Sequence, residues 1–261
     1  MINFLINRFL YLVFILTLAA SCSNQKSSEG DTESTDSSEG YVSIFDGKAL
    51  DNWMGDSIHW RVENGCIVGE TTEETPLEAN TFLIWQGGEP ADFELILDFR
   101  ITETGNSGIQ YRSELVDGVP YGLMGYQADI DGRNNYTGQN YEERKRATLA
   151  YRGQKVIVNS AENPGAPVRE NVQKNAWQST DVVASLGTSD ELKEKIKAQD
   201  WNECKLVIKG NKLEHYINGI LMSEVTDNDR YNYESFGLLG FQIHRGPPMK
   251  VEYKNIRYKA L

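Results

Sequence analysis

Phe93-Glu94-Leu95-Ile96-Leu97-Asp98-Phe99-Arg100-Ile101 is the longest stretch of this chain in which apolar and polar side chains alternate. Successive side chains of a β-strand point to opposite faces, so the alternation predicts a strand buried on one face only. Shorter stretches of the same kind precede and follow it. Asn-Gly pairs at 64–65 and 218–219 predict tight hairpins between such strands, because Asn and Gly tolerate positive φ.

Helical patterns are scarce in the chain. Residues 188–198 predict a helix, since Thr188 and Glu191 have capping-box spacing and Leu192 and Ile196 share one face. Strands dominate and helices do not alternate with them. The sequence therefore predicts an all-β fold, a two-sheet antiparallel sandwich with one short helix, over residues 41–261.

The first 40 residues are predicted to lie outside the sandwich. Arg8 precedes an apolar run at 9–20 that is short for a membrane span and typical of a signal peptide. The run ends in Leu18-Ala19-Ala20-Ser21-Cys22, which resembles the lipobox of bacterial lipoproteins. We expect a signal peptide at 1–21 and a lipid on Cys22; an uncleaved anchor helix is the alternative. Residues 22–40, rich in Ser, Glu, Asp, Thr and Gly, predict a disordered tether that anchors the protein in the cell envelope, periplasmic or at the cell surface.

The net charge of the chain limits the kinds of partner that we expect. The formal net charge is −12, and the signal peptide carries only Arg8, so the mature chain is near −13. Without a basic stripe, nucleic acids and anionic membrane surfaces are not expected partners; the membrane is reached through the lipid alone.

Cys66 and Cys204 lie in apolar strand patterns and are expected as buried free thiols, although an exported protein permits a bridge.

Three other predicted strands, at 108–112, 126–131 and 239–244, have polar faces unlike ordinary solvated surface, where Lys and Glu prevail. If they are neighbours, they line one groove with Gln110, Arg112, Gln127, Asp129, Asp131, Gln242 and His244. A solvated face rich in amides is the alternative, since periodicity does not say which strands are adjacent. The long stretch 132–181 either arches over this groove and supplies side chains or is held by its own hairpin at 148–159.

Short motifs along the chain resemble the 3-keto-disaccharide hydrolase domain family. They are Tyr41-Val42-Ser43-Ile44-Phe45-Asp46-Gly47 continuing to Trp53, Trp60-Arg61-Val62-Glu63-Asn64-Gly65, Asp92-Phe93-Glu94-Leu95, Gly105-Asn106-Ser107-Gly108-Ile109, Gly125-Tyr126-Gln127-Ala128-Asp129-Ile130-Asp131 and Asp200-Trp201-Asn202-Glu203. The resemblance spans 41–261. It implies a concanavalin A-like jelly roll whose concave face binds sugar. It also implies action on glycosides already oxidised at C3, by hydrolysis or by elimination followed by hydration.

The groove residues suit that chemistry. A ketone at C3 acidifies the C2 proton, which a carboxylate or imidazole removes while donors hold the enolate and the C1 substituent leaves. Asp129, Asp131 and His244 are the candidate catalytic residues, and the same three could hold a divalent cation such as calcium or manganese. The substrate-binding candidates are Gln110, Arg112, Gln127, Gln242, Glu70 and Glu142. The expected partner is an oligosaccharide or glycoside, with a sugar oxidoreductase acting upstream.

Two other functions stay open. A non-catalytic carbohydrate-binding protein would stack sugars on tryptophans, of which the chain has Trp53, Trp60, Trp85, Trp177 and Trp201, but Trp53, Trp60 and Trp201 are expected in the core. A conventional glycoside hydrolase needs an acid and a second carboxylate flanking one bond, and Glu94 and Asp98 lack the spacing found in jelly-roll glucanases. His215 is expected to be packed or at the surface, and His59 is left open.

Overall fold

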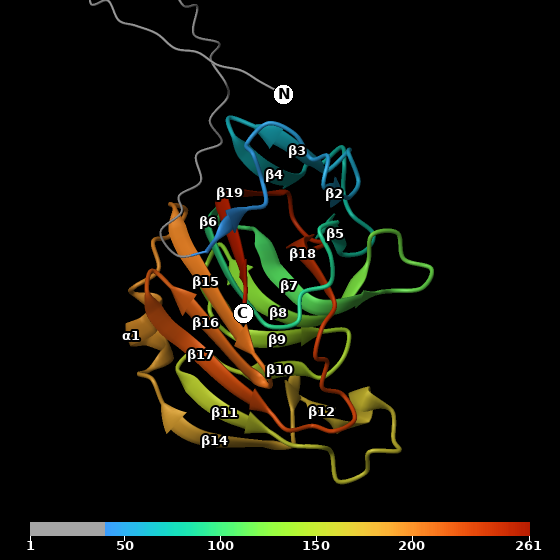
Figure 1. The fold of residues 1–261 in the computed structure, drawn as a ribbon, viewed down its shortest axis with the longest axis vertical. Helices are drawn as coiled ribbons and strands as arrows, with labels where there is room; N and C mark the ends of the chain where they lie inside the picture. Colours follow the sequence, from blue (N-terminus) through green and yellow to red (C-terminus); the bar gives the residue numbers. More distant parts are fainter. Residues whose placement is uncertain (1–39) are drawn as a thin grey trace, which may run out of the picture. The chain divides into compact units, whose positions relative to one another are not determined.

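The computed structural model describes residues 40–261, which form two β-sheets packed face to face (Figure 1). The predicted signal peptide, nearly all of the predicted tether and Cys22 lie outside the described residues. Within residues 40–261, no helix is long and apolar enough to cross a membrane.

The ten-stranded sheet has its strands in the order β14 (Thr180–Ser185), β11 (Gln154–Val158), β17 (Ile220–Asp227), β16 (Lys212–Ile217), β15 (Asn202–Lys209), β6 (Phe93–Ile101), β19 (Met249–Ala260), β4 (Cys66–Thr71) and β3 (Trp60–Glu63), with β1 (Val42–Ser43) paired to β19. The nine-stranded sheet has the order β12 (Val172–Gln173), β13 (Ala176–Trp177), β10 (Ala147–Ala150), β9 (Asn140–Glu143), β8 (Leu123–Asp131), β7 (Asn106–Leu115), β18 (Leu238–Ile243), β5 (Thr81–Trp85) and β2 (Trp53–Met54). Most neighbours are antiparallel as predicted, but β11–β17 and β10–β13 are parallel, so both sheets are mixed.

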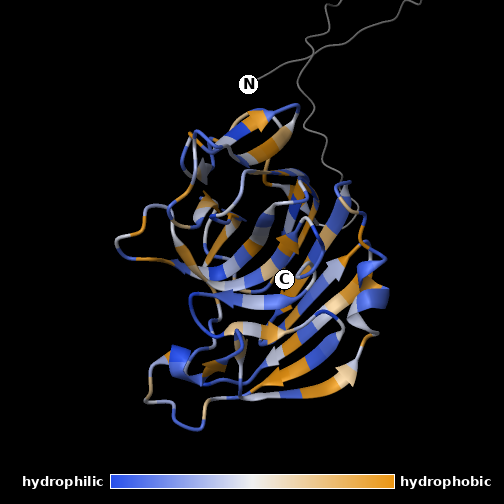
Figure 2. Cartoon of the chain, turned by 180° about the vertical axis from the view of Figure 1, so that it is seen from behind, coloured by the Kyte–Doolittle hydropathy of each residue, from blue (hydrophilic) through white to orange (hydrophobic). Residues whose placement is uncertain are grey.

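The core lies between the sheets and is built by the alternation that the sequence displays. In β6 every second residue from Phe93 to Ile101 is buried, and the residues between them are partly exposed. Figure 2 shows this alternation as orange and blue bands along the strands. Tyr111 of β7 and Tyr126 of β8 stack in the core with ring centroids 5.5 Å apart. Because burial of apolar area drives this packing, the outward positions of the same strands are free to be polar.

The local predictions are mostly confirmed. Both Asn-Gly hairpins form, between β3 and β4 and between β16 and β17, with positive φ at all four turn residues. The helix α1 (Ser189–Lys193) has the predicted capping box on Thr188 but is shorter than predicted, and Leu192 and Ile196 are buried. A short 3₁₀ helix, η1 (Val168–Asn171), precedes β12. Cys66 and Cys204 are buried free thiols.

The hairpin at 148–159, one of the two alternatives for this stretch, does not form. β10 pairs with β9 and β13 in the nine-stranded sheet, whereas β11 pairs with β14 and β17 in the ten-stranded sheet. The turn at 151–153 therefore carries the chain from one sheet to the other.

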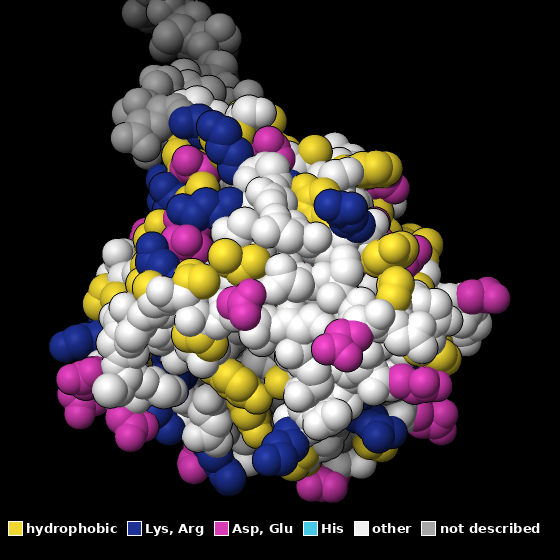
Figure 3. Space-filling view, turned by 90° about the horizontal axis from the view of Figure 1, so that it is seen from below, with side chains coloured by type: hydrophobic (Ala, Val, Ile, Leu, Met, Phe, Trp, Pro, Cys, Tyr) yellow, Lys and Arg dark blue, Asp and Glu magenta, His cyan; other side chains and the backbone are white. Residues whose placement is uncertain are grey.

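On the face seen in Figure 3, positive and negative side chains are interspersed, so no field of one sign covers it.

Candidate active site

The outward face of the nine-stranded sheet brings predicted groove residues together. β8, β7 and β18 are consecutive strands, and the register sets Gln110 opposite Gln127 on one side and Gly240 on the other. Gln110 Nε2 lies 3.0 Å from Gln127 Oε1, and Gln127 Nε2 lies 3.4 Å from Gln242 Oε1. The glutamines of three strands thus form one polar surface.

Gln127 and Gln242 line a pocket of about 220 Å³, which we call the inner pocket, whereas Gln110 is fully buried and does not line it. Its lining residues are Asn106, Gln127, Asp129, Tyr136, Gln139, Tyr141, Glu143, Asn175, Gln242 and His244. Half of them come from the stretch 132–181, which confirms that this stretch contributes side chains to the groove.

A wider groove of about 670 Å³, the outer groove, adjoins the inner pocket. It is lined by Ala79, Asn80, Val119, Tyr141, Glu143, Arg144, Arg169, His244 and Arg245. Tyr141, Glu143 and His244 line both spaces and so mark the junction between them.

Asp129 is the buried carboxylate of the inner pocket, with only 8% of the residue exposed. Its Oδ1 accepts a hydrogen bond from Gln127 Nε2 at 2.6 Å, and its Oδ2 accepts one from Gln139 Nε2 at 2.5 Å. Burial raises the pKa of Asp129 to about 7; the two amide donors oppose the rise, and the charges of Glu143 and Asp131 add to it. Both protonation states are therefore populated near neutral pH, as suits a group that takes or gives a proton.

The side-chain amide of Gln110 is fully buried next to these residues. It lies 3.0 Å from Gln127 Oε1 and within 2.6–3.3 Å of Ser113 Oγ and of the carbonyls of Gly125 and Tyr126, which need the amide nitrogen as their donor. Gln110 therefore supports Gln127 rather than Asp129 directly.

The junction between the two spaces carries three groups able to exchange protons. Glu143 accepts a hydrogen bond from Asn80 Nδ2 at 3.1 Å. Burial raises the pKa of Tyr141, and the Glu143 charge adds to this. His244 is half-buried and its Nδ1 lies 2.6 Å from the carbonyl of Arg245, so a neutral ring donates there and keeps Nε2 as an acceptor.

Sequence reasoning missed several lining residues, above all Tyr141 and Glu143. They alternate with Asn140 and Glu142 along β9, so one of these two pairs faces the pocket and the other faces the core. If Tyr141 is known to face the pocket, strict alternation selects Glu143 rather than Glu142. All four side chains are polar or amphipathic, however, so their hydropathy does not show which of them face the pocket.

Two predicted groove residues point elsewhere. Arg112 has φ of +44° at a register shift between β7 and β8, which removes it from the face of Gln110. Its buried guanidinium donates to the carbonyls of Ala91 and Gly210. Asp131 accepts backbone N–H bonds from residues 135, 136 and 137 at 2.7–3.0 Å, so it holds the turn after β8 rather than a ligand.

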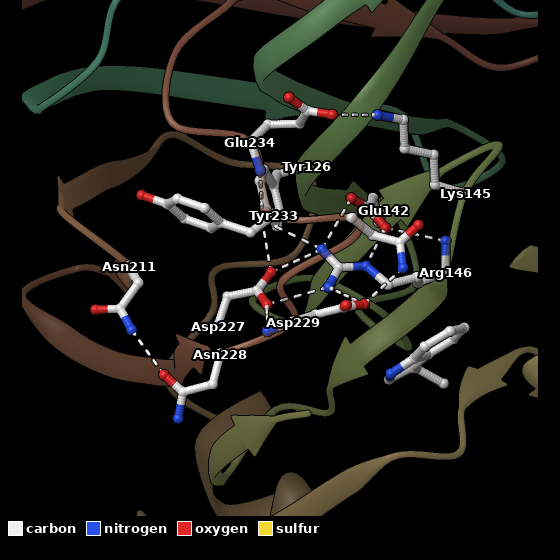
Figure 4. Close-up of polar contacts among 12 residues, drawn as sticks. Tyr126, Glu142, Lys145, Arg146, Asn211, Asp227, Asn228, Asp229, Tyr233 and Glu234 are labelled. Carbon is white, nitrogen blue, oxygen red and sulfur yellow. Dashed lines mark hydrogen bonds and ion pairs between the residues drawn. The ribbon is translucent and has the colours of Figure 1, made fainter. Parts of the chain in front are cut away.

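Glu142 was also misplaced, because it faces the core. It pairs with Arg146 at 2.6 Å in a fully buried cluster that also holds Asp227 and Asp229 (Figure 4). The Tyr126 hydroxyl donates to Asp227 Oδ2 at 2.6 Å. Since Glu142 lies on β9 and Asp227 ends β17, the cluster ties the two sheets together.

Glu70 does not reach the pocket either. It lies on β4 of the ten-stranded sheet and pairs with Arg61 at 2.6 Å. His215 is packed as expected: its Nε2 lies 2.9 Å from the Tyr111 hydroxyl, and burial lowers its pKa to about 4, so it is neutral at neutral pH. His59 is buried between Asp56 and the carbonyl of Thr75.

The tryptophans lie away from the inner pocket and the outer groove, and Trp53 and Trp85 line a separate pocket of about 380 Å³. Trp53, Trp60 and Trp177 are in the core. The expectation of a core position is wrong for Trp201, which is half-buried beneath Arg100 and Lys254 with cation–ring distances of 4.8 and 3.9 Å.

The three predicted metal ligands do not assemble. Asp131 is saturated by backbone donors, and both oxygens of Asp129 accept hydrogen bonds from amides. Across residues 40–261, no group of three or more His, Cys, Asp or Glu side chains has a metal-binding arrangement. These residues do not fit the proposed calcium or manganese site.

Comparisons with known proteins bear on the fold and the family of this chain. A 3-keto-disaccharide hydrolase from Bacteroides thetaiotaomicron is 34% identical over 85 residues, which cover 30% of this chain and only 29% of that protein. A Parabacteroides distasonis structure described as a "putative glycosyl hydrolase" has a TM-score of 0.53 at 21% identity and covers 85% of this chain and 94% of its own. A galectin-like Bacillus subtilis protein of unknown function has a TM-score of 0.50 at 14% identity, covering 80% and 90%.

The two solved structures confirm the jelly-roll fold. The family described as the 3-keto-alpha-glucoside-1,2-lyase-like domain matches residues 40–259, nearly the whole described chain. This chain belongs to that family.

Proposed function

We propose that this protein cleaves the glycosidic bond of glycosides that carry a ketone at C3, with Asp129 as the base that removes the C2 proton. The observation that carries the proposal is the Asp129 carboxyl group, buried in the inner pocket with its pKa raised to about 7. A base of that pKa is half ionised at neutral pH and strong enough to deprotonate a carbon next to a ketone. The family and its hydrolase relative support the choice of substrate.

The proposed reaction begins with transfer of the C2 proton to Asp129. The electron pair of the C2–H bond moves into an enolate whose charge lies on the C3 oxygen. It then forms the C1–C2 double bond as the C1–O bond breaks, and the leaving oxygen takes a proton. Addition of water across that double bond completes a net hydrolysis; without it the product is the unsaturated keto sugar.

The lining residues supply the remaining roles in this proposal. The side-chain amides of Asn106 and Gln242 are donors for the enolate oxygen, where developing charge gains most from fixed dipoles. His244 and Tyr141 stand at the junction with the outer groove, where the leaving group would lie, and either can return the proton. Gln127 and Gln139 hold the base in one orientation.

A conventional glycoside hydrolase is the second candidate, and one observation favours it. Asp129 and Glu143 line the same inner pocket, so a carboxyl group with a raised pKa and a second carboxylate face one space. An acid and a nucleophile or base of this kind are what direct hydrolysis needs. A non-catalytic sugar-binding protein is the third candidate, since five of the ten lining residues of the inner pocket are amides. Simple binding does not need a buried carboxyl group with a raised pKa, which favours the enzyme.

One incubation series tests these functions. The purified protein is given a 3-keto-glucoside and its unoxidised parent in D₂O, with and without chelator, and products are followed by NMR. Our proposal predicts cleavage of the keto substrate alone, with solvent deuterium entering at C2 faster than in an enzyme-free control. Cleavage of the unoxidised parent would favour the conventional hydrolase. Sugar binding without any product would favour the binding protein.

A further inference from the structure

The outer groove is unusual for this chain because it gathers positive charge. The whole sequence has 38 acidic against 26 basic residues. The groove lining nevertheless contains three arginines, Arg144, Arg169 and Arg245, and Glu143 as its one carboxylate.

The guanidinium groups of these arginines have few partners. Arg144 Nε lies 3.9 Å from Glu143 Oε1, at the limit of an ion pair. Arg169 donates to the carbonyl of Lys145 at 3.3 Å and also interacts with the Tyr141 hydroxyl group. Arg245 donates to the carbonyl of Glu78 at 3.4 Å. Each guanidinium has five N–H donors, so most of them remain available.

Arginines on the ten-stranded sheet are paired much more tightly. Arg61 lies 2.8 and 2.6 Å from the carboxylates of Glu63 and Glu70, and Arg100 lies 2.7 Å from Glu252. The loose pairing in the outer groove is thus a local property. It leaves three exposed guanidinium groups, with most of their N–H donors free, along the rim of one concave space.

We propose that the outer groove binds an anionic substituent on the leaving group of the substrate, a carboxylate or a sulfate ester. The inference rests on the proposed function, since the inner pocket holds the keto sugar and the junction residues mark where the bond breaks. A volume of about 670 Å³ suits a further ring bearing such a group, because small-molecule sites span about 300–1,000 Å³. Planar guanidinium groups bind both anions through paired N–H bonds.

The test compares aryl leaving groups that share one ring and carry a neutral or an anionic para substituent; the comparison between protein variants below removes their intrinsic differences in leaving ability. Aryl 3-keto-glucosides of 4-hydroxybenzamide, 4-hydroxybenzoate and 4-hydroxyphenyl sulfate are assayed with the wild-type protein. We expect kcat/KM to favour at least one anion by about tenfold or more, mainly through KM, and the preference to shrink as salt is raised. The benzoate and sulfate arms distinguish the two anions.

The arginines are then tested directly. Arg169→Gln combined with Arg245→Gln should bring the ratio of anionic to neutral kcat/KM close to one. Arg230→Gln is the matched control, because Arg230 is exposed and does not line the groove. An equal kcat/KM for all three substrates, or a preference that survives the double variant, would overturn the inference and leave the proposed function intact.

If no keto glycoside is cleaved, the proposed function fails and calorimetry decides the inference. Wild-type and double-variant proteins are titrated with the unoxidised glucoside of 4-hydroxybenzoate and its benzamide counterpart. Tighter binding of the benzoate that disappears in the double variant supports an anion site. Equal binding of the two, or no difference between the proteins, removes it.

Discussion

Gln127 occupies the space above Gly108: a β-carbon added at Gly108 would lie 2.5 Å from Cγ and Cδ of Gln127 and 2.6 Å from its Nε2. The absence of a side chain on β7 thus lets Gln127 of β8 lie flat across the neighbouring strand and reach Asp129. Glycine is needed here for close approach rather than for its φ.

Gly108→Ala should displace Gln127 and lower turnover of a 3-keto-glycoside by about tenfold or more, because Asp129 loses an aligned donor. The atoms in the way are the end of a side chain, so the loss of unfolding free energy should stay within about 1–3 kcal/mol. Turnover and urea unfolding are measured together. Gly165→Ala is the control, since a β-carbon there meets only one side-chain atom, at 3.7 Å; equal turnover in both variants would contradict the role given to Gln127.

The pH profile of kcat/KM should report the Asp129 carboxyl group. A base acts when ionised, so kcat/KM is expected to rise with pH through an apparent pKa near 7 and to level off above it. Asp129→Asn should lower turnover by about 10²-fold or more and abolish that limb. His244→Ala should lower turnover to a similar extent, with Lys205→Ala, on the ten-stranded sheet, as the control that stays within about twofold. An unchanged limb in Asp129→Asn would assign it to another group.

The same carboxyl group should make stability depend on pH. Its pKa is higher in the folded protein, about 7, than the ordinary 3.8, so the folded state favours the protonated form. That stabilisation is complete below about pH 4 and is lost as pH rises to about 7. Asp129→Asn cannot ionise, so its unfolding free energy relative to wild type should increase across this window, by at most about 4 kcal/mol. A difference that is constant with pH would refute the raised pKa.

Much of the fold and part of the site follow from the sequence, and the reasons for the failures are physical. Alternation identified the strands and put Gln127 and Asp129 on one polar face, and the resemblance to a family implied that this face is concave. Arg112 was misassigned because a register shift and a positive φ break the alternation within β7. Glu142 was misassigned because its burial depends on Arg146 and on a partner strand far away in the chain, which periodicity cannot reveal.

The buried cluster around Arg146 should contribute to stability rather than to catalysis. Arg146→Met leaves Glu142, Asp227 and Asp229 buried without a cation, so we expect a loss of about 3–5 kcal/mol in unfolding free energy. Lys205→Ala should change it by no more than about 0.5 kcal/mol. Chemical denaturation with a pH control measures both. A loss in Arg146→Met as small as in the surface variant would mean that the acids take up protons at little cost.

Lipidation of Cys22 stays a prediction, because the residue lies outside the described part of the chain. In a bacterial host, the full-length protein should partition with membranes, and Cys22→Ala should abolish both lipid attachment and signal cleavage before position 22. Mass spectrometry of the N-terminus and membrane fractionation measure the two effects. Wild-type mature protein without lipid, in the soluble fraction, would exclude the anchor.

Alternate residues of β8 face the core and the inner pocket, which has a consequence for how such proteins can be varied. Tyr126, Ala128 and Ile130 fill the core, while Gln127 and Asp129, between them, line the inner pocket. Tyr136 and Arg169 at the rim are exposed, and unlike Arg144 and Asn175, with φ of +61° and +59°, they have no positive φ. A mutant library confined to Tyr136 and Arg169 would therefore vary the surroundings of the pocket without touching the packing on which folding depends.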